Sequence, residues 1–506
     1  MQPYLRNAPA RRLTYCKSAV FKLGFVALVA IGMLAFTHAA YAFTLKFDQS
    51  AYSGNVWVQI EKPLAFNFNA TYANGTKSID FTDGGVTVLM SKPVKLSHIG
   101  AGGLNITFSQ SAVFYVYYDD PTDNDRTAAP AFMVSPQRFQ SFELTMMGGS
   151  GDQGNLTAIN YFTAPLSIRS YDIHNNLLQQ TGFGSATAAQ IGARFAAATG
   201  GNPNAVVKDA NGKIVRYLGP SNGFTGTNPW PSFIPYTKSI HAAKQQTHIK
   251  RSNGFNFAAP DNIPVYQFGA DMTATANANG SLTITGSITV SVNAPIKPNN
   301  PSLPPDGQWT GATFSFSVSD TNAFNNAVYG QTAPLDNKGA VIFTGQAWSD
   351  FKTFTQATRK DPSQPHNPST NPSLYDLGAY DTTLRMFIGE VTTGLLGGFF
   401  NSDYQVGGVA LKNMYSNQWW SLNPMVAYSE IQPLHPFYNL YAAVIFDESH
   451  NTVYGVPYSD RFGTGPLVNT VSFNGTEVNY WVLGVGAPLP GTKALPGIMM
   501  LLLGNQ

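Results

Sequence analysis

The stretch S-F-E-L-T-M at 141–146, followed by L-T-A-I-N-Y-F-T-A-P-L at 156–166, decides how the fold of this chain is interpreted. Both segments are typical of β-strands, and the glycine-rich segment 148–155 between them predicts a loop. The first strand contains a single acid, Glu143. A carboxylate among strand residues costs desolvation free energy, so it usually has a function or a partner. We therefore expect Glu143 either to face an open surface or to pair with Arg138 or Arg169.

Residues 1–42 have the pattern of a secretory signal. Cationic residues are followed by an apolar run at 23–36, and A-Y-A at 40–42 forms a small-x-small cleavage site. A membrane anchor is disfavoured because this run is shorter than the roughly 20 apolar residues that a spanning helix needs. We therefore expect cleavage before Phe43, a secreted or periplasmic protein, and no membrane contact after cleavage.

Removal of the signal changes the charge of the chain. The formal net charge is +2 for the whole sequence and becomes −3 without residues 1–42, because five cations and no acid leave with them. The mature charge therefore gives no indication of nucleic-acid binding. Cys16, the one cysteine, also lies in the signal, which excludes a disulfide or a cysteine metal site in the mature protein. The histidines show no ligand spacing, so we expect no metal and no cofactor.

Composition and pattern predict a mainly β protein with an α/β part. Charged residues make up only 11% of the chain, and short alternating runs are separated by turn signals. The middle of the chain predicts helices at 186–199, after Pro235 and at 381–400, a hairpin with its turn at Asn279–Gly280, and proline-rich loops at 294–306 and 361–372. The predicted organisation is a β-domain from 43–183 and 425–506, with a mixed α/β domain at 184–424. We expect a monomer.

The strands around Glu143 and Asn160 resemble the centre of glycoside hydrolase family 64, a family of bacterial β-1,3-glucanases. There, a strand with Glu-aromatic-Thr precedes one with Val-Asp-x-Phe-x-x-Pro. F-E-L-T matches the first motif with Leu144 in the aromatic position, and I-N-Y-F-T-A-P matches the second with Asn160 in place of the acid. The segment 439–460 is similar to the family's late N-x-Y-A-x-I…Y-G-x-x-x-x-D pattern. The resemblance spans about 110–460 at low identity, with insertions near 294–310 and 346–380.

The resemblance implies a thaumatin-like β-barrel or sandwich and an inserted α/β domain, with a wide groove between them. It implies a secreted hydrolase that cleaves β-1,3-glucan, a polysaccharide, by an inverting acid/base mechanism with Glu143 as the general acid. The base position would be Asn160. Four further positions would line the groove: Thr145, Phe162, Tyr458 and Asp460. Independently of the resemblance, Trp419 and Trp420 form either a stacking platform for a sugar or part of the core.

Asn160 leaves three alternatives open, because an amide cannot accept a proton near neutral pH. Another acid could act as the base, and the candidates are Asp152, Asp172, Asp119 and Asp120. The enzyme could instead be slow. The chain could also be a non-catalytic β-glucan-binding or cell-surface interaction protein on the same fold. The working hypothesis is a hydrolase with a relocated base.

Overall fold

The fold is described from a computed structural model, and the prediction of a mostly β protein with some helices is confirmed. The structure describes residues 43–61, 68–72, 78–81, 93–118, 120–121, 130–146, 152–258, 264–292, 307–330, 339–357, 379–419, 422, 439–457, 467–470, 472–473 and 476–489. The predicted signal and both proline-rich loops lie outside these ranges.

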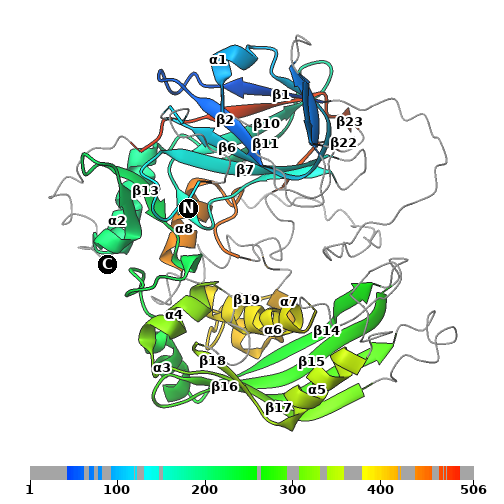
Figure 1. Cartoon of the computed structure of the whole chain (residues 1–506). Coiled ribbons are helices and arrows are strands. Elements are labelled where there is room, and N and C mark those ends of the chain that lie inside the picture. Colours follow the sequence, from blue (N-terminus) through cyan, green and yellow to red (C-terminus); the bar gives the residue numbers. More distant parts are fainter. Residues whose placement is uncertain are drawn as a thin grey trace, which may run out of the picture.

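The larger sheet has twelve strands and occupies the upper half of Figure 1. Its strands are β1 (Phe43–Asp48), β2 (Trp57–Glu61), β3 (Phe68–Tyr72), β4 (Ser78–Phe81), β5 (Val94–Lys95), β6 (Leu104–Tyr117), β7 (Phe139–Met146), β8 (Gln153–Leu156), β10 (Leu166–Tyr171), β11 (Leu177–Gly182), β21 (Leu467–Asn469) and β24 (Tyr480–Val485). The main path runs β11-β10-β24-β1-β6-β7-β8-β21, and β2 and β3 also pair with β6. The short helix α1 (Leu96–Ile99) follows β5.

Strand β24 joins distant parts of the chain within this sheet. It pairs parallel with β1 and antiparallel with β10. At the ends of the path, β11 and β21 are connected by the side chain of Gln179, which donates to the Leu467 carbonyl at 2.5 Å and accepts from the Asn469 amide at 3.3 Å. Between β11 and β21, side-chain hydrogen bonds take the place of backbone strand pairing, so the described strands form no closed barrel.

One face of the large sheet packs into the main hydrophobic core. Ile60 of β2, Phe114 of β6, and Phe142 and Leu144 of β7 are all 0% exposed. Because successive strand residues point to opposite faces, the residues between them point away from this core. Glu143 is one of these, and it is exposed between two fully buried neighbours.

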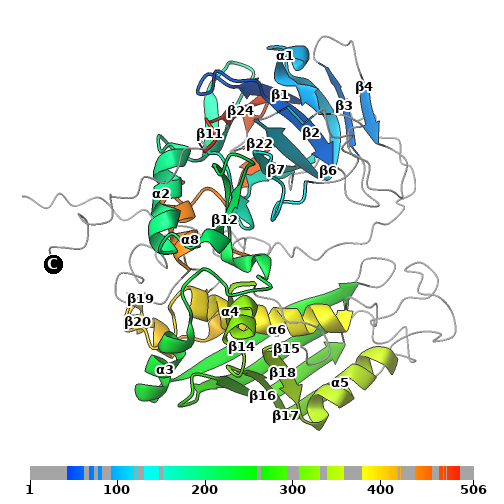
Figure 2. The ribbon, with the colours of Figure 1, turned by 60° about the vertical axis from the view of Figure 1, so that its left-hand side comes forward.

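A five-stranded antiparallel sheet forms the lower half of Figure 1. Its strands are β14 (Gln246–Ala258), β15 (Pro264–Ala276), β16 (Leu282–Val292), β17 (Gly307–Phe316) and β18 (Val341–Thr344). Helices α4 (Thr321–Gly330), α5 (Gln346–Ala357) and α6 (Ala379–Leu396) accompany it, and Figure 2 shows α6 running along the side of this sheet that faces the upper one. Trp348 of α5 packs against Phe314 of β17 and Phe387 of α6, which joins both helices to the sheet.

Smaller elements connect or flank the two sheets. A three-stranded sheet is built from β12 (Val206–Lys208), β13 (Ile214–Leu218) and β9 (Tyr161–Phe162). Helices α2 (Ala188–Ala198) and α8 (Leu440–Glu448) pack together, with Phe195 stacked on Tyr441 at a ring distance of 4.7 Å. The remaining elements are η1 (Pro203–Ala205), η2 (Pro220–Asn222), α3 (Ile234–Ala242), β19 (Gln405–Val406), β20 (Val409–Ala410), η4 (Leu411–Asn413), α7 (Ser416–Trp419), β22 (Ser472–Phe473) and β23 (Thr476–Glu477).

The three predicted helices correspond to α2, α3 and α6. Helix α2 begins with a capping box, in which Thr187 and Gln190 each satisfy a backbone amide of the other, and it ends before Gly200 and Gly201. Two predicted boundaries differ from the structure. The hairpin loop covers 277–281 instead of two residues, and β8 begins at Gln153, inside the segment that glycine content assigned to a loop. No helix in the described ranges has the length and apolarity to span a bilayer.

Candidate active site

The side chains that β7 directs away from the core belong to a surface shared with three other strands. Directly paired residues on antiparallel strands point to the same side, so the register identifies the members of this surface. We call it the Glu143 face. It consists of Trp57, Gln59 and Glu61 of β2, Val113, Tyr115 and Tyr117 of β6, Phe139, Ser141 and Glu143 of β7, and Asn155 of β8.

One end of the Glu143 face is covered by aromatic side chains. Trp57, Tyr117, Phe139 and Tyr161 form a cluster that is separate from the main core, and each is at most 7% exposed. Arg216 of β13 lies over the cluster, with its guanidinium 3.9 Å from the centre of the Phe139 ring. The attraction between the guanidinium cation and the face of the Phe139 ring stabilises Arg216 in this position.

Arg216 also fixes the segment that precedes β7. Its side chain is 0% exposed and donates to the carbonyl oxygens of Phe132 at 2.7 Å, Ser135 at 3.0 Å and Gln137. A buried guanidinium needs such acceptors, and its planar fork can reach several at once. Arg216 therefore holds residues 132–137 over the closed end of the Glu143 face.

The other end of the face is open to solvent at Glu143. The Asn155 amide nitrogen donates to Glu143 Oε2 at 3.2 Å, so β8 orients the carboxylate. Thr145, one step further along β7, is partly exposed. Strand β8 approaches closely here because residue 154 is glycine: a Cβ at Gly154 would lie 2.4 Å from the Trp481 ring and 2.8 Å from the Glu143 carbonyl oxygen.

Tyrosine hydroxyls connect the strands across the face. Tyr115 donates to Glu61 Oε2 at 2.7 Å, and Tyr117 donates to Gln59 Oε1 at 2.7 Å. Tyr161 donates to Ser141 Oγ at 2.9 Å. Burial raises the pKa of Tyr161 to about 12, and burial together with the hydrogen bond to Glu61 raises the pKa of Tyr115 far above its usual value. Both phenols therefore stay protonated and remain donors at ordinary pH.

The structure places the arginines that could have neutralised Glu143 elsewhere. Arg169 forms an ion pair with Asp48 at 2.7 Å. The guanidinium of Arg138 donates to the Leu489 carbonyl at 3.3 Å. Glu143 has no ion pair within the described part of the chain, so the alternative of a structural carboxylate paired with either arginine is not supported.

Asn160, at the predicted base position, lies on an exposed bend after β8. Its carbonyl oxygen accepts from Gly219 at 2.8 Å and from the Asn222 side chain at 2.5 Å. Its side-chain oxygen accepts from Ser221 at 3.4 Å. In the strand register, Asn155 and not Asn160 is the residue opposite Glu143.

The alternative bases have contrasting surroundings. Asp152 is 3% exposed at the start of β8. Asp172 caps the turn between β10 and β11, where its carboxylate accepts from the Asn176 side chain at 2.9 Å and from the backbone amides of His174 and Asn176 at 2.8 Å each. These hydrogen bonds, that of the Asn176 side chain first, lower the pKa of Asp172. Asp120 is exposed beyond the end of β6, and Asp119 is not among the described residues.

Two predicted sugar-binding residues belong to the core instead. Phe162 is 0% exposed and packs against Phe183 and Phe195. Trp419 is also 0% exposed, between Phe399 and Phe400, so its indole forms no platform for a sugar. Three further predicted positions lie outside the described residues: Trp420, Tyr458 and Asp460.

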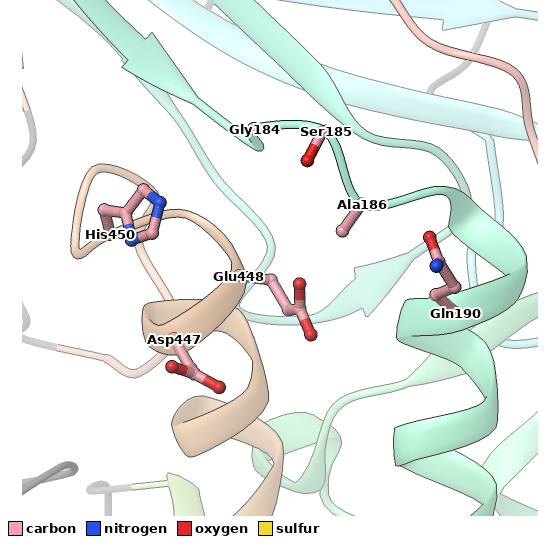
Figure 3. A pocket seen from close by; sticks show the side chains of 7 residues that line it. All are labelled: Gly184, Ser185, Ala186, Gln190, Asp447, Glu448 and His450. Carbon is pink, nitrogen blue, oxygen red and sulfur yellow. The ribbon is translucent and has the colours of Figure 1, made fainter.

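A polar hollow of about 340 Å³ lies elsewhere, between the start of α2 and the end of α8 (Figure 3). Its two carboxylates, Asp447 and Glu448, both form ion pairs with Arg194. Both carboxylates are thus engaged by one guanidinium, and the hollow is a weaker candidate for chemistry than the Glu143 face. No cluster of three or more potential metal ligands occurs in the ranges that the structure covers.

Comparison of the sequence with family models and with curated proteins finds no match. Comparison of the structure finds distant similarity to solved β-1,3-glucanases. A glycoside hydrolase family 64 domain from Clostridium beijerinckii matches with a TM-score of 0.42 and 11% identity, covering 88% of this chain and 98% of that one. A laminaripentaose-producing β-1,3-glucanase in complex with laminaritetraose matches with a TM-score of 0.41 and 12% identity, covering 88% and 98%. A Paenibacillus barengoltzii enzyme with laminarihexaose matches with a TM-score of 0.37 and 13% identity, covering 88% and 75%.

Proposed function

We propose that this protein is a glycoside hydrolase that cleaves β-1,3-glucan, with Glu143 as the general acid. The observation that carries the proposal is the position of Glu143: an exposed carboxylate on a strand, at the open end of a surface of aromatic and amide side chains. Sugar rings offer hydroxyls at their edges and C–H groups on their faces, which amides and aromatic rings can contact. The F-E-L-T and I-N-Y-F-T-A-P motifs supply the substrate class through their resemblance to family 64.

As the general acid, Glu143 protonates the departing glycosidic oxygen. General acid catalysis of this kind contributes about 10²–10⁴ in rate. The Asn155 amide, which donates at 3.2 Å, restricts the rotation of the carboxylate, so the acid is held in one orientation relative to the strand. An inverting mechanism additionally needs a carboxylate that activates water on the opposite side of the sugar.

A second candidate function is glucan binding without hydrolysis. It is favoured by Asn160, whose amide cannot act as a base and whose backbone and side-chain oxygens accept hydrogen bonds from Gly219, Ser221 and Asn222. The aromatic and polar surface of the Glu143 face would serve binding equally well.

The two functions are separated by incubating the chain from Phe43 onward with laminarin and measuring reducing ends. Glu143→Gln keeps the shape of the side chain and removes the acid, while Glu477→Gln makes the same change at an exposed position of β23. Hydrolysis predicts activity in wild type and Glu477→Gln, with a loss of about 10²-fold or more in Glu143→Gln. Retention on insoluble β-1,3-glucan without release of sugar would instead establish the binding function.

A separate variant tests the role of residue 160. Asn160→Asp restores the acid of the family motif. A rise in activity of more than about tenfold would mean that position 160 is the site of the base and that the natural enzyme is weakened. An unchanged rate would place the proton acceptor elsewhere.

A further inference from the structure

A second carboxylate lies in the same cross-strand row as Glu143. Glu61 of β2 pairs with Val113 of β6, and Val113 pairs on its other side with Glu143. The three side chains therefore point to one face of the sheet, with the two acids on either side of a valine. We infer that Glu61 is the general base of the Glu143 site, an inference that rests on the proposed hydrolase function.

The spacing of the row fits this role. Neighbouring strands lie about 4.8 Å apart, so the backbones at Glu61 and Glu143 are separated by about 9.5 Å across β6. The carboxyls of inverting glycosidases lie about 6.5–9.5 Å apart, which leaves room for the sugar and the attacking water, and the backbone separation of this row is close to the upper end of that range. The central position is Val113, which adds no charge and no hydrogen-bonding group between the acids.

Tyr115 holds Glu61 in a defined position. Its hydroxyl donates to Glu61 Oε2 at 2.7 Å from two residues along β6, on the same face. Because Tyr115 stays protonated, this bond leaves Glu61 Oε1 to contact a water molecule. Glu61 is half-buried. The face thus holds two oriented carboxylates, one through Tyr115 and one through Asn155.

The other acids are placed less favourably. Asp172 is surrounded by three hydrogen-bond donors of its own turn. Its strand, β10, is separated from β7 by β24, β1 and β6 in the sheet order. Asp152 is almost fully buried at the start of β8. Of the acids on the described strands, Glu61 alone shares the face and the row of Glu143.

The reaction is balanced with these two groups and one water. Glu61 accepts a proton from the water as the water oxygen forms a bond to the anomeric carbon. Glu143 transfers its proton to the glycosidic oxygen as the bond from that oxygen to the anomeric carbon breaks. The products are two shorter glucan chains, one of which carries an inverted anomeric hydroxyl. Proton exchange with solvent then restores protonated Glu143 and ionised Glu61.

The test compares two substrates, laminarin and a β-laminaribiosyl fluoride. Fluoride leaves without protonation, so a variant without the acid keeps its activity on the fluoride, whereas a variant without the base does not. Glu143→Gln should lose about 10²-fold or more on laminarin and retain fluoride hydrolysis. Glu61→Gln should lose about 10²–10⁴-fold on both substrates. Added azide should restore turnover of the fluoride by Glu61→Ala and give the α-glycosyl azide.

Glu477→Gln is the matched control, and circular dichroism confirms that each variant is folded. If Glu61→Gln cleaves both substrates within about threefold of wild type while Glu143→Gln fails on laminarin, the assignment of Glu61 is overturned and the hydrolase function stands. If wild type releases neither reducing ends nor fluoride, the proposed function itself fails.

Discussion

Replacement of Arg216 by methionine tests what holds the closed end of the Glu143 face. The unbranched methionine preserves much of the apolar stem and removes the guanidinium. That group is 0% exposed and donates to the carbonyls of Phe132, Ser135 and Gln137. It also lies 3.9 Å from the centre of the Phe139 ring.

The expected loss follows from the acceptors that remain. Removing both partners of a buried hydrogen bond can leave stability nearly unchanged. Arg216→Met removes only the donor, because the acceptors are backbone carbonyls that no side-chain substitution changes. Each carbonyl left without a donor costs about 1–3 kcal/mol. With three such carbonyls at Arg216, we expect the free energy of unfolding to fall by at least about 3 kcal/mol.

The control is Arg169→Met, which removes the ion pair with Asp48. The side chains of that pair are 32% and 36% exposed, so they are well hydrated. Exposed pairs of this kind contribute about 0.2–1 kcal/mol. Urea unfolding of the two variants gives the comparison, and amide hydrogen exchange should show lost protection at the start of β7 only for Arg216→Met. Similar stabilities, within about 1 kcal/mol of each other, would refute the view that Arg216 fixes segment 132–137.

Two further predictions concern β8 and the turn after β10. Gly154→Ala forces a methyl group to within 2.4 Å of the Trp481 ring, so it should destabilise the protein by about 1–3 kcal/mol and lower laminarin hydrolysis. Gly184→Ala, where an added methyl meets no atom within 4 Å, should leave both the stability and laminarin hydrolysis unchanged. Equal thermal midpoints for Gly154→Ala and Gly184→Ala would contradict the prediction. Asp172 has a folded-state pKa below its ordinary 3.8, so its contribution to stability is present above pH 3.8 and is lost as the pH falls through the folded pKa. Asp172→Asn should therefore be less stable than wild type at pH 7, with the difference shrinking below pH 3.8, and a pH-independent difference in thermal midpoints would argue against this.

Local sequence patterns were sufficient for several elements and insufficient for the site. Alanine content and the double glycine after residue 199 predict α2 because both signals lie in the helix itself or directly after it. The residues around Glu143 predict that this acid lies on a strand, but they leave open whether it is exposed or paired with an arginine. These inferences depend only on neighbouring residues.

The partners of Glu143 could not be inferred in this way. Glu61 directly follows the alternating run V-W-V-Q-I, but its alignment with Glu143 depends on the register of β2 and β7 on either side of β6. That register is set by the core-facing residues of three strands that are distant in sequence. Burial is similarly non-local. Trp419 was a candidate stacking platform and Phe162 a candidate groove residue, and tertiary packing places both side chains inside the protein.

The interior position of β24 has a consequence for biosynthesis. This strand, residues 480–485, is translated after most of the chain, yet it lies between β10 and β1. In a ribosome-bound chain that still lacks β24, the edges of β10 and β1 that pair with β24 have no hydrogen-bonding partner. Open strand edges of this kind promote association between chains. The large sheet can therefore be completed only after residue 485 has emerged, and premature termination before residue 480 should yield insoluble material rather than a smaller folded protein.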